Sequence, residues 1–353
     1  MEIVVCEGDE TGQELLIEAL RVLDSDLLGL PIKLHRFDLS LENRRRTSNA
    51  VVTESAQAMR QVGFGLKAAT ITPAGADDVG SPNRILREAI GGSVIVRSGR
   101  RLPGVTPLAP IVHPIVVVRM AVGDAYGADE ERHGATGAAD EEATRVERID
   151  RRHCRATAEY SFVTAAAIGA HVYGGPKWTV SPVYEGMLKE ELDGASERYP
   201  DVIYRPTLID AAYAGFIHEA SESPIVMPTL NRDGDCLSDL VLALFGSIAG
   251  AESVLLALDA ELRPGVVMAE APHGTAPALK GKNVANPLAM VLACAAVLDY
   301  AGRAGDTAAA AAAAAIRNAA FEATARGVRT VDLGGSYSTS EVVDEIVRGL
   351  GGA

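Results

Sequence analysis

The chain has 353 residues, enough for about two domains at the usual size of roughly 150 residues each. Hydrophobic residues make up 48% and charged residues 23% of it, which is typical of folded globular proteins and excludes disordered and fibrous classes. The formal net charge of -14 makes nucleic acid an unfavourable partner, because phosphates repel an acidic protein. An anionic substrate would therefore need a local cluster of cationic side chains.

Cysteine spacing and hydropathy favour a cytoplasmic location. The four cysteines are scattered without CxxC spacing, which predicts reduced thiols rather than disulfides or a zinc site. The N-terminus lacks the basic and apolar regions of a signal peptide. The longest apolar run, Leu288 to Leu298, has eleven residues, against about 20 needed to span a membrane. We therefore expect a cytoplasmic protein without a membrane partner.

Short apolar runs alternate with helical patterns along the chain, and this order predicts an α/β fold. The expected strands and helices are strands at 3–6, 94–96, 115–118 and 254–258, and helices at 14–23 and 237–248. Residues 127–155 are charged and nearly free of large apolar side chains, which predicts an exposed arm that could pack on a second subunit. Asn286 and Pro287 are typical of a helix start, and Ala308 to Ala315 of a plain helix.

Asp235 and Asp239 form the sharpest local pattern. They are four residues apart, so both carboxylates share one face of a helix, where their mutual repulsion costs about 0.2 to 0.5 kcal/mol. A divalent cation would remove this repulsion, and oxygen ligands favour Mg²⁺ or Mn²⁺ over zinc. A solvated helix N-terminus, where acidic residues are also favoured, is the alternative.

Two further patterns concern anions and nucleotides. Arginines gather at positions 84, 87, 97, 100, 101 and 119, which suits a multiply anionic small molecule, although scattered surface arginines remain the alternative. Glu270 to Pro277 is a turn-rich segment with one histidine, able to wrap a flat ligand. The nearest GxGxxG candidate, residues 63–68, lacks the third glycine, so we expect no Rossmann site. Lys177 precedes the only tryptophan, where partial burial could make it a base.

The order of the motifs resembles the isocitrate and isopropylmalate dehydrogenase family of β-decarboxylating dehydrogenases, and the chain is identified as a divergent isocitrate-type member. The motifs cover nearly the whole chain: Lys67 to Pro73, Ser81 to Asn83 with Arg87, Arg97, Arg119 with Asp124 to Tyr126, Lys177, Asp210, Asn231 to Asp239, Glu270 to Pro277, Asn286-Pro287, and Arg329 to Gly335 with Thr339.

The resemblance implies a homodimer with shared active sites. Each subunit would have a large discontinuous α/β domain, residues 1–92 and 246–353, and a smaller central α/β domain, residues 93–245. The charged arm, about residues 124–155, would clasp the second subunit.

The resemblance also implies roles for individual residues. Asp235 and Asp239 would bind Mg²⁺ or Mn²⁺ together with Asp210 of the other subunit. Lys177 would take the hydroxyl proton, and Tyr126 would protonate the enol. The substrate-binding residues would be Ser81, Asn83, Arg87, Arg97 and Arg119, and the cofactor-binding residues Thr72, Glu270, His273, Gly274, Thr275, Ala276, Leu279 and Asn286.

Departures from the family pattern concern the substrate and the cofactor. Ser81 and Asn83 are polar where isopropylmalate-type members have apolar residues, and the segment 75–80, with Asp77 and Asp78, is one residue longer than usual. With Arg84 and Arg100 nearby, we expect an isocitrate-like acid, in one version with a phosphonate as its distal group. Leu279 favours NAD, while Lys280 or Lys282 could attract the 2′-phosphate of NADP.

Three alternatives remain open at this point. The protein could be an isocitrate dehydrogenase proper. It could be a catalytically silent regulatory subunit of the family, although three converging aspartates have no physical use in such a subunit. It could also be a metal-dependent phosphoester or aldol enzyme that uses the same aspartates.

Overall fold

The structure is a computed structural model that describes residues 1–74 and 78–351. Its centre is a ten-stranded sheet in the order β2-β1-β3-β12-β11-β4-β5-β10-β8-β9. The strands are β1 (Glu2–Glu7), β2 (Lys33–Asp38), β3 (Phe64–Lys67), β4 (Val94–Gly99), β5 (Ile115–Met120), β8 (His171–Tyr173), β9 (Tyr204–Arg205), β10 (Ile225–Thr229), β11 (Ser253–Leu258) and β12 (Pro264–Glu270). Both ends of the sheet are parallel, whereas β12, β11, β4 and β5 pair antiparallel in the middle.

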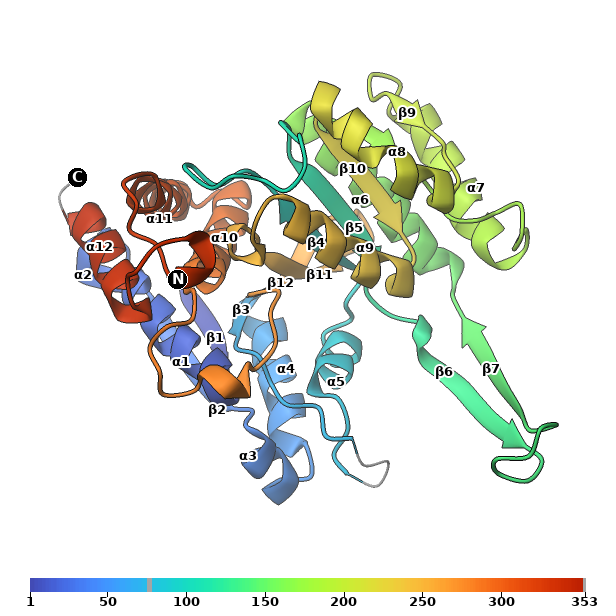
Figure 1. Ribbon diagram of the computed structural model, residues 1–353, viewed down its shortest axis with the longest axis horizontal. Coiled ribbons are helices and arrows are strands. Elements are labelled where there is room, and N and C mark those ends of the chain that lie inside the picture. The colour runs from blue at the N-terminus through green and yellow to red at the C-terminus, as the bar shows by residue number, and fades with distance from the viewer. Residues whose placement is uncertain (75–77, 352–353) are drawn as a thin grey trace.

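Helices cover both faces of the sheet, which confirms the predicted α/β class (Figure 1). They are α1 (Glu10–Ala19), α2 (Ser25–Leu28), α3 (Leu41–Arg46), α4 (Ala50–Val62), α5 (Pro82–Ala89), α6 (Arg151–Ile168), α7 (Tyr184–Arg198), α8 (Ile209–Glu222), α9 (Asn231–Leu244), α10 (Leu288–Arg303), α11 (Thr307–Ala325) and α12 (Thr339–Gly351). Alternation along the strands divides the core: Ile3 and Val5 face α1 and α10, whereas Val4 and Cys6 face α4. The face with α4 and α5 continues into a further core cluster under α8 and α9.

The charged arm is a hairpin of β6 (Asp124–His133) and β7 (Glu142–Arg148), which projects away from the rest of the chain (Figure 1). Most of its side chains are exposed. The expected arm ends too late, because residues 151–155 already form the beginning of α6, where Cys154 is fully buried. An isolated hairpin is at best marginally stable in water, so the arm depends on contacts at its base or with another molecule.

Three helix starts differ from the expected ones. The helix expected at 14–23 begins at Glu10 and ends at Ala19, and a short 3-10 helix, Leu20–Leu23, follows it. The helix expected at 237–248 begins at Asn231 and ends at Leu244, so Asp235 lies in its second turn rather than at its solvated end. Asn286 is one residue outside the cap: Pro287 is the cap of α10, and Asn286 Oδ1 accepts a hydrogen bond from the Leu288 N–H at 3.0 Å.

The sheet crosses the expected domain boundaries. β4, from the expected small domain, pairs with β11 from the expected large one. The division at residues 92 and 245 therefore stays a prediction. Over residues 1–74 and 78–351, no helix is long and apolar enough to cross a bilayer.

Candidate active site

Four polar side chains form a row across the middle of the sheet. Lys67 of β3 pairs with Glu270 of β12, Glu270 with Ser253 of β11, and Ser253 with Arg97 of β4. Directly opposed residues on neighbouring strands point to the same face, here the face that carries α4, α5 and α9. The strand register thus assembles polar groups that are distant in sequence.

Lys67 and Glu270 form a nearly buried ion pair at one end of this row. Lys67 Nζ lies 3.2 Å from Glu270 Oε2, and its side chain is 1% exposed. Burial raises the pKa of Glu270, but Lys67, Arg87 and Arg97 together outweigh this and hold that pKa below its ordinary value. Lys67 begins the motif Lys67 to Pro73, but no role in the site is predicted for it from the sequence. Its position at the end of a buried strand, in a chain with few lysines, was the available signal.

Arg119 of β5 holds α9 against the sheet. Its side chain is 1% exposed, its Nε donates to Asn231 Oδ1 at 2.9 Å, and its Nη1 bonds Asp235 Oδ1. Gly234 permits this approach, since a Cβ there would lie 2.7 Å from the Arg119 Cβ. The glycine before Asp235 therefore has a packing reason.

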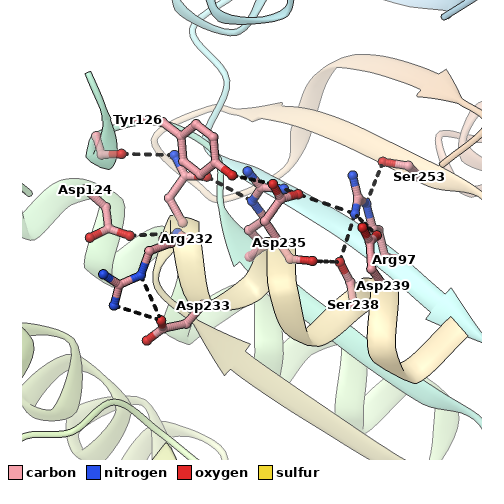
Figure 2. Close-up of polar contacts among 12 residues, drawn as sticks. Arg97, Asp124, Tyr126, Arg232, Asp233, Asp235, Ser238, Asp239 and Ser253 are labelled. Atoms are coloured by element: carbon pink, nitrogen blue, oxygen red, sulfur yellow. Dashed lines mark hydrogen bonds and ion pairs between the residues drawn. The ribbon is translucent and has the colours of Figure 1, made fainter. Parts of the chain in front are cut away.

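Asp235 and Asp239 share one face of α9, as expected, and Arg97 contacts both (Figure 2). Arg97 Nη1 lies 3.5 Å from Asp235 Oδ1 and 3.0 Å from Asp239 Oδ1. Burial raises the pKa of Asp235, but Arg119, the Tyr126 hydroxyl and Arg97 lower it by a larger amount. The pKa of Asp235 therefore lies below the ordinary value of an aspartate. Asp235 is therefore ionised at neutral pH.

Tyr126 reaches Asp235 because the base of the arm is tied to the start of α9. Asp124 has a left-handed backbone, φ 61°, and its Oδ2 accepts from the Arg232 N–H at 2.7 Å (Figure 2). The Tyr126 hydroxyl then donates to Asp235 Oδ2. Burial and this hydrogen bond raise the pKa of Tyr126, which keeps the phenol protonated.

These residues surround a cavity of about 700 Å³. The predicted site residues that line it are Ser81, Asn83, Arg87, Arg97, Arg119, Tyr126, Asp235, Asp239, Glu270, His273 and Gly274. Arg84, which was expected near the substrate, also lines it, as do residues without a predicted role, including Lys67, Thr70 and Glu88. The structure thus brings most predicted substrate residues to one place.

Arg87 is a cation of this cavity that Glu270 and Asp235 influence from beyond ion-pair distance. It lies on α5, and within residues 1–74 and 78–351 its guanidinium forms no ion pair. Burial lowers its pKa below the ordinary arginine value, although it remains charged. A partly buried guanidinium that is not paired with a carboxylate of the protein is a strong binding site for an anionic group of a ligand.

Three polar atoms of the cavity are buried without a hydrogen-bond partner in the described residues: Asn83 Oδ1, Thr70 Oγ1 and His273 Nε2. His273 Nδ1 lies 3.0 Å from the Gly274 carbonyl oxygen. Burial lowers the pKa of His273, so its ring is neutral; Nδ1 then donates to Gly274 and Nε2 is a free acceptor. Buried polar atoms without partners indicate ligand contacts.

Lys177 and Asp210 lie together outside this cavity. Lys177 Nζ is 2.5 Å from Asp210 Oδ2, and neither residue lines the cavity. Lys177 lowers the pKa of Asp210 through this contact. The Trp178 ring lies 5.1 Å from the ammonium group of Lys189, so the tryptophan engages a different lysine from the expected one. No group of three metal-ligating side chains forms in the described part of one chain.

The remaining predicted cofactor residues lie elsewhere: Thr72, Thr275, Ala276, Leu279 and Asn286 do not line the main cavity. Leu279 lines a smaller cavity of about 240 Å³ with Thr11, Val284 and Ala285. Asn286 Nδ2 donates to Asp332 Oδ2 at 3.0 Å. The main cavity and this smaller one are separate in the structure.

Two expectations about charged residues near the substrate, Arg100 and the longer segment 75–80, need correction or restriction. Arg100 bonds the nearly buried Glu252 and does not line the cavity, so it is not available to a substrate. Asp77 lies outside the described residues. Asp78 does not approach the cavity but pairs with Arg45 at 2.6 Å.

Known proteins resemble the chain over most of its length. The family described as isocitrate/isopropylmalate dehydrogenase matches residues 2–346. An isocitrate dehydrogenase (NADP) of Thermus thermophilus is 30% identical over 300 residues, covering 84% of this chain; the match spans 58% of that relative's length. A 3-isopropylmalate dehydrogenase of Methanothermobacter thermautotrophicus is 29% identical over 351 residues, 99% of this chain and 98% of the relative.

The fold is also shared with a solved structure. The crystal structure of isocitrate dehydrogenase from Methylococcus capsulatus superimposes with a TM-score of 0.86 at 21% identity, over 99% of both chains. Since the family match covers nearly the whole chain, the protein belongs to the isocitrate/isopropylmalate dehydrogenase family.

Proposed function

We propose that the protein catalyses metal-dependent oxidative decarboxylation of an isocitrate-like 2-hydroxy polyacid, with hydride transfer to NAD. The observation that carries the proposal is the convergence of Arg87, Arg97 and Arg119 on one cavity, where Arg87 forms no ion pair with the residues that the structure describes. In a chain of net charge -14, cations gathered in one cavity against the overall field indicate an anionic ligand.

The polar wall of the cavity favours a polar distal group on the substrate. Ser81 and Asn83 stand at the start of α5, and Asn83 Oδ1 is buried without a partner. A branched alkyl group would leave this amide unpaired, and such sites reject apolar analogues by factors of about 10⁴. Arg100 is bonded to Glu252, and Arg84, the other of the two additional arginines, lies 3.9 Å from Glu88. We therefore propose a carboxylate before a phosphonate as the distal group.

The donor set fits a hard divalent cation. Asp235 and Asp239 offer carboxylate oxygens one helical turn apart, which suits Mg²⁺ or Mn²⁺. Within one chain, the cavity contains Asp235 and Asp239 but not Asp210, so Asp210 of a second copy would be the third carboxylate ligand. When bound, such a cation would polarise the substrate hydroxyl and stabilise the negative charge left after loss of CO₂.

The chain's own groups would hold the substrate and move its protons. Arg87, Arg97 and Arg119 bind the carboxylates and orient the carbon that carries the hydroxyl. Lys177 takes the hydroxyl proton as hydride leaves the same carbon, and the β-carboxylate then departs as CO₂. Tyr126, a protonated phenol at the cavity, returns a proton to the carbon that lost the carboxylate.

Lys177 would come from a second copy of the chain. Its amine is paired with Asp210 outside the cavity, so both groups would enter a neighbouring cavity together. The exposed arm offers a contact for such a dimer. A homodimer with shared active sites accounts for the separation of these two residues from Asp235 and Asp239.

The choice of NAD rests on Leu279 and on the pairing of a nearby lysine. Ala278 has no charge, and Lys280, which could attract a 2′-phosphate, is paired with Glu10 at 3.0 Å. Glu10 and then Glu14 raise the pKa of Lys280. A dianionic phosphate would therefore have to compete with Glu10 and Glu14 for Lys280.

A substrate panel followed at the nicotinamide absorbance band tests the proposal. The panel contains isocitrate, homoisocitrate, isopropylmalate and a phosphonomethyl malate, each with Mn²⁺ and with NAD or NADP. We expect an acid with an anionic distal group to have the highest kcat/KM, with NAD preferred. The highest kcat/KM for isopropylmalate would contradict the role of Ser81 and Asn83.

A further inference from the structure

We propose that Arg44 is a positioning residue that sets the edge of the substrate cavity and thereby its preference for the distal group. The inference rests on the proposed function for the identity of the substrate, but not for the geometry. Arg44 lies on α3, is 0% exposed and is among the largest fully buried side chains. Such a residue needs an explanation, because a buried guanidinium is costly unless its donors are satisfied.

The Arg44 guanidinium donates to backbone carbonyls in three separate places. Its Nε bonds the Leu39 oxygen at 3.0 Å, its Nη1 bonds the Gly80 oxygen at 3.3 Å, and its Nη2 bonds the Ile71 oxygen. In the described part of the chain it has no carboxylate within ion-pair distance. Burial lowers its pKa below the ordinary arginine value, and Asp9 and Asp78 partly offset this. The charged guanidinium therefore binds backbone carbonyl groups rather than a carboxylate.

Asp9 holds the same stretch of backbone from its other side. Its Oδ2 accepts from the Ile71 N–H at 2.8 Å, and its Oδ1 accepts from the Leu41 N–H at 2.9 Å. Both polar groups of Ile71 are therefore bound, one to Asp9 and one to Arg44. Leu41 is the first residue of α3, so Asp9 links the start of this helix to residue 71.

The returning side of the same loop is fastened to α3 and α4. Arg45 binds Asp78 through two bonds, at 3.2 Å and 2.6 Å. Asn49 Nδ2 donates to the Val79 oxygen at 2.6 Å. With the bond from Arg44 to Gly80, residues 78, 79 and 80 are each held by the segment 44–49.

These contacts bear on the cavity because their immediate neighbours line it. Thr70 precedes Ile71, and Gly80 is followed by Ser81 and Asn83; all four of Thr70, Gly80, Ser81 and Asn83 line the cavity. One guanidinium thus spans the two sides of the cavity wall. A lysine could not replace it, because a single ammonium nitrogen cannot match the planar fork that reaches several acceptors.

The test compares Arg44→Lys with Arg46→Lys as a matched control. Arg46 lies on the same helix, is exposed, and bonds Asn43 on its own helix. For Arg44→Lys we expect kcat/KM to fall about tenfold or more with an acid that carries the anionic distal group, mainly through KM, because displaced contact groups weaken binding. With malate, which lacks the distal group, kcat/KM should change little. Arg46→Lys should match the wild type with both acids.

Amide hydrogen exchange gives a second readout that needs no activity. In Arg44→Lys, exchange should accelerate at residues 70–74 and 78–83 and stay unchanged in α10. If Arg44→Lys does not fold, Arg45→Ala and Asn49→Ala replace it, with smaller changes at the same residues.

Two results would overturn the proposal: a folded Arg44→Lys protein with wild-type exchange at these residues, or an equal loss with malate and with the larger acid. Should the wild type turn over no acid of the panel, the proposed reaction fails. The exchange rates alone then decide whether Arg44 holds the cavity edge.

Discussion

The cavity and the Lys177–Asp210 pair differ in how the fold supports them. In the cavity, Lys67 and Arg119 are each 1% exposed and are bound to carboxylates on neighbouring elements. Lys177 is 29% exposed and Asp210 63%, and they contact each other rather than the cavity. One chain thus builds a rigid binding surface in its sheet and presents its expected base at another surface. This difference supports the proposal that a complete site combines residues of two copies of the chain.

Complementation between two inactive variants is the sharpest way to break this comparison. Lys177→Met removes the base and Asp239→Asn removes a metal ligand, and each should lower kcat about 10² to 10⁴-fold. Mixed and allowed to exchange subunits, the two should recover about one quarter of the wild-type rate, because mixed dimers hold one intact site. The rate is followed at the nicotinamide band. No recovery despite proven subunit exchange would place both residues in the site of one chain.

Metal removal tests the cavity half by itself. Excess chelator should abolish turnover, and Mg²⁺ or Mn²⁺ should restore it. Without the cation, the carboxylates of Asp235 and Asp239 form ion pairs with Arg97 and Arg119 instead. The control is an unchanged circular dichroism spectrum with chelator. Full turnover in chelator would remove the metal from the proposal.

The buried pair in the cavity wall should matter most for stability. Glu270→Gln leaves Lys67 charged and nearly buried without its partner, and breaking such a pair costs about 3 to 5 kcal/mol of unfolding free energy. Urea unfolding measures the loss. The matched control is Glu261→Gln, whose partner Arg263 is 72% exposed, where we expect about 0.5 kcal/mol or less. Equal losses would mean that the sheet row contributes no special stability.

The same variant has a pH signature. The pKa of Glu270 is below its ordinary 4.5 in the folded chain, so the unfolded chain binds the proton first as pH falls. Its stabilising contribution is complete above pH 4.5 and is lost as pH falls through the lowered pKa. The unfolding free energy of Glu270→Gln should therefore depend less steeply on pH below 4.5 than that of the wild type. Parallel curves in acid would contradict the lowered pKa.

The smallest effect is expected in the arm. Arg148 and Asp129 form an ion pair between β6 and β7, but their side chains are 67% and 70% exposed. Arg148→Ala should change the unfolding free energy by about 1 kcal/mol or less, because solvent screens such pairs. A larger loss in urea unfolding would show that this part of the arm is covered in solution, as a clasp between two copies would be.

Local patterns in the sequence were sufficient for the α/β class, the family and most cavity residues. Asp235 and Asp239 share a helix face because a spacing of four residues dictates it, whatever the helix packs against. The continuous apolar runs in β1 and β4 likewise indicated strands buried on both faces. These features depend on near neighbours in the chain.

Tertiary structure decided the contacts between distant residues. The alignment of Lys67, Glu270, Ser253 and Arg97 follows from the register of four strands, which no local pattern contains. Arg100 and Arg97 are only three residues apart, yet one faces Glu252 and the other the cavity. In the sequence, Arg44 is one of three consecutive arginines with no distinguishing pattern. Only the folded chain places three backbone carbonyl oxygens around its guanidinium. The sequence determines which chemical groups a segment carries and which face of a helix or strand they share. The partners of those groups depend on which segments the packed sheet brings together.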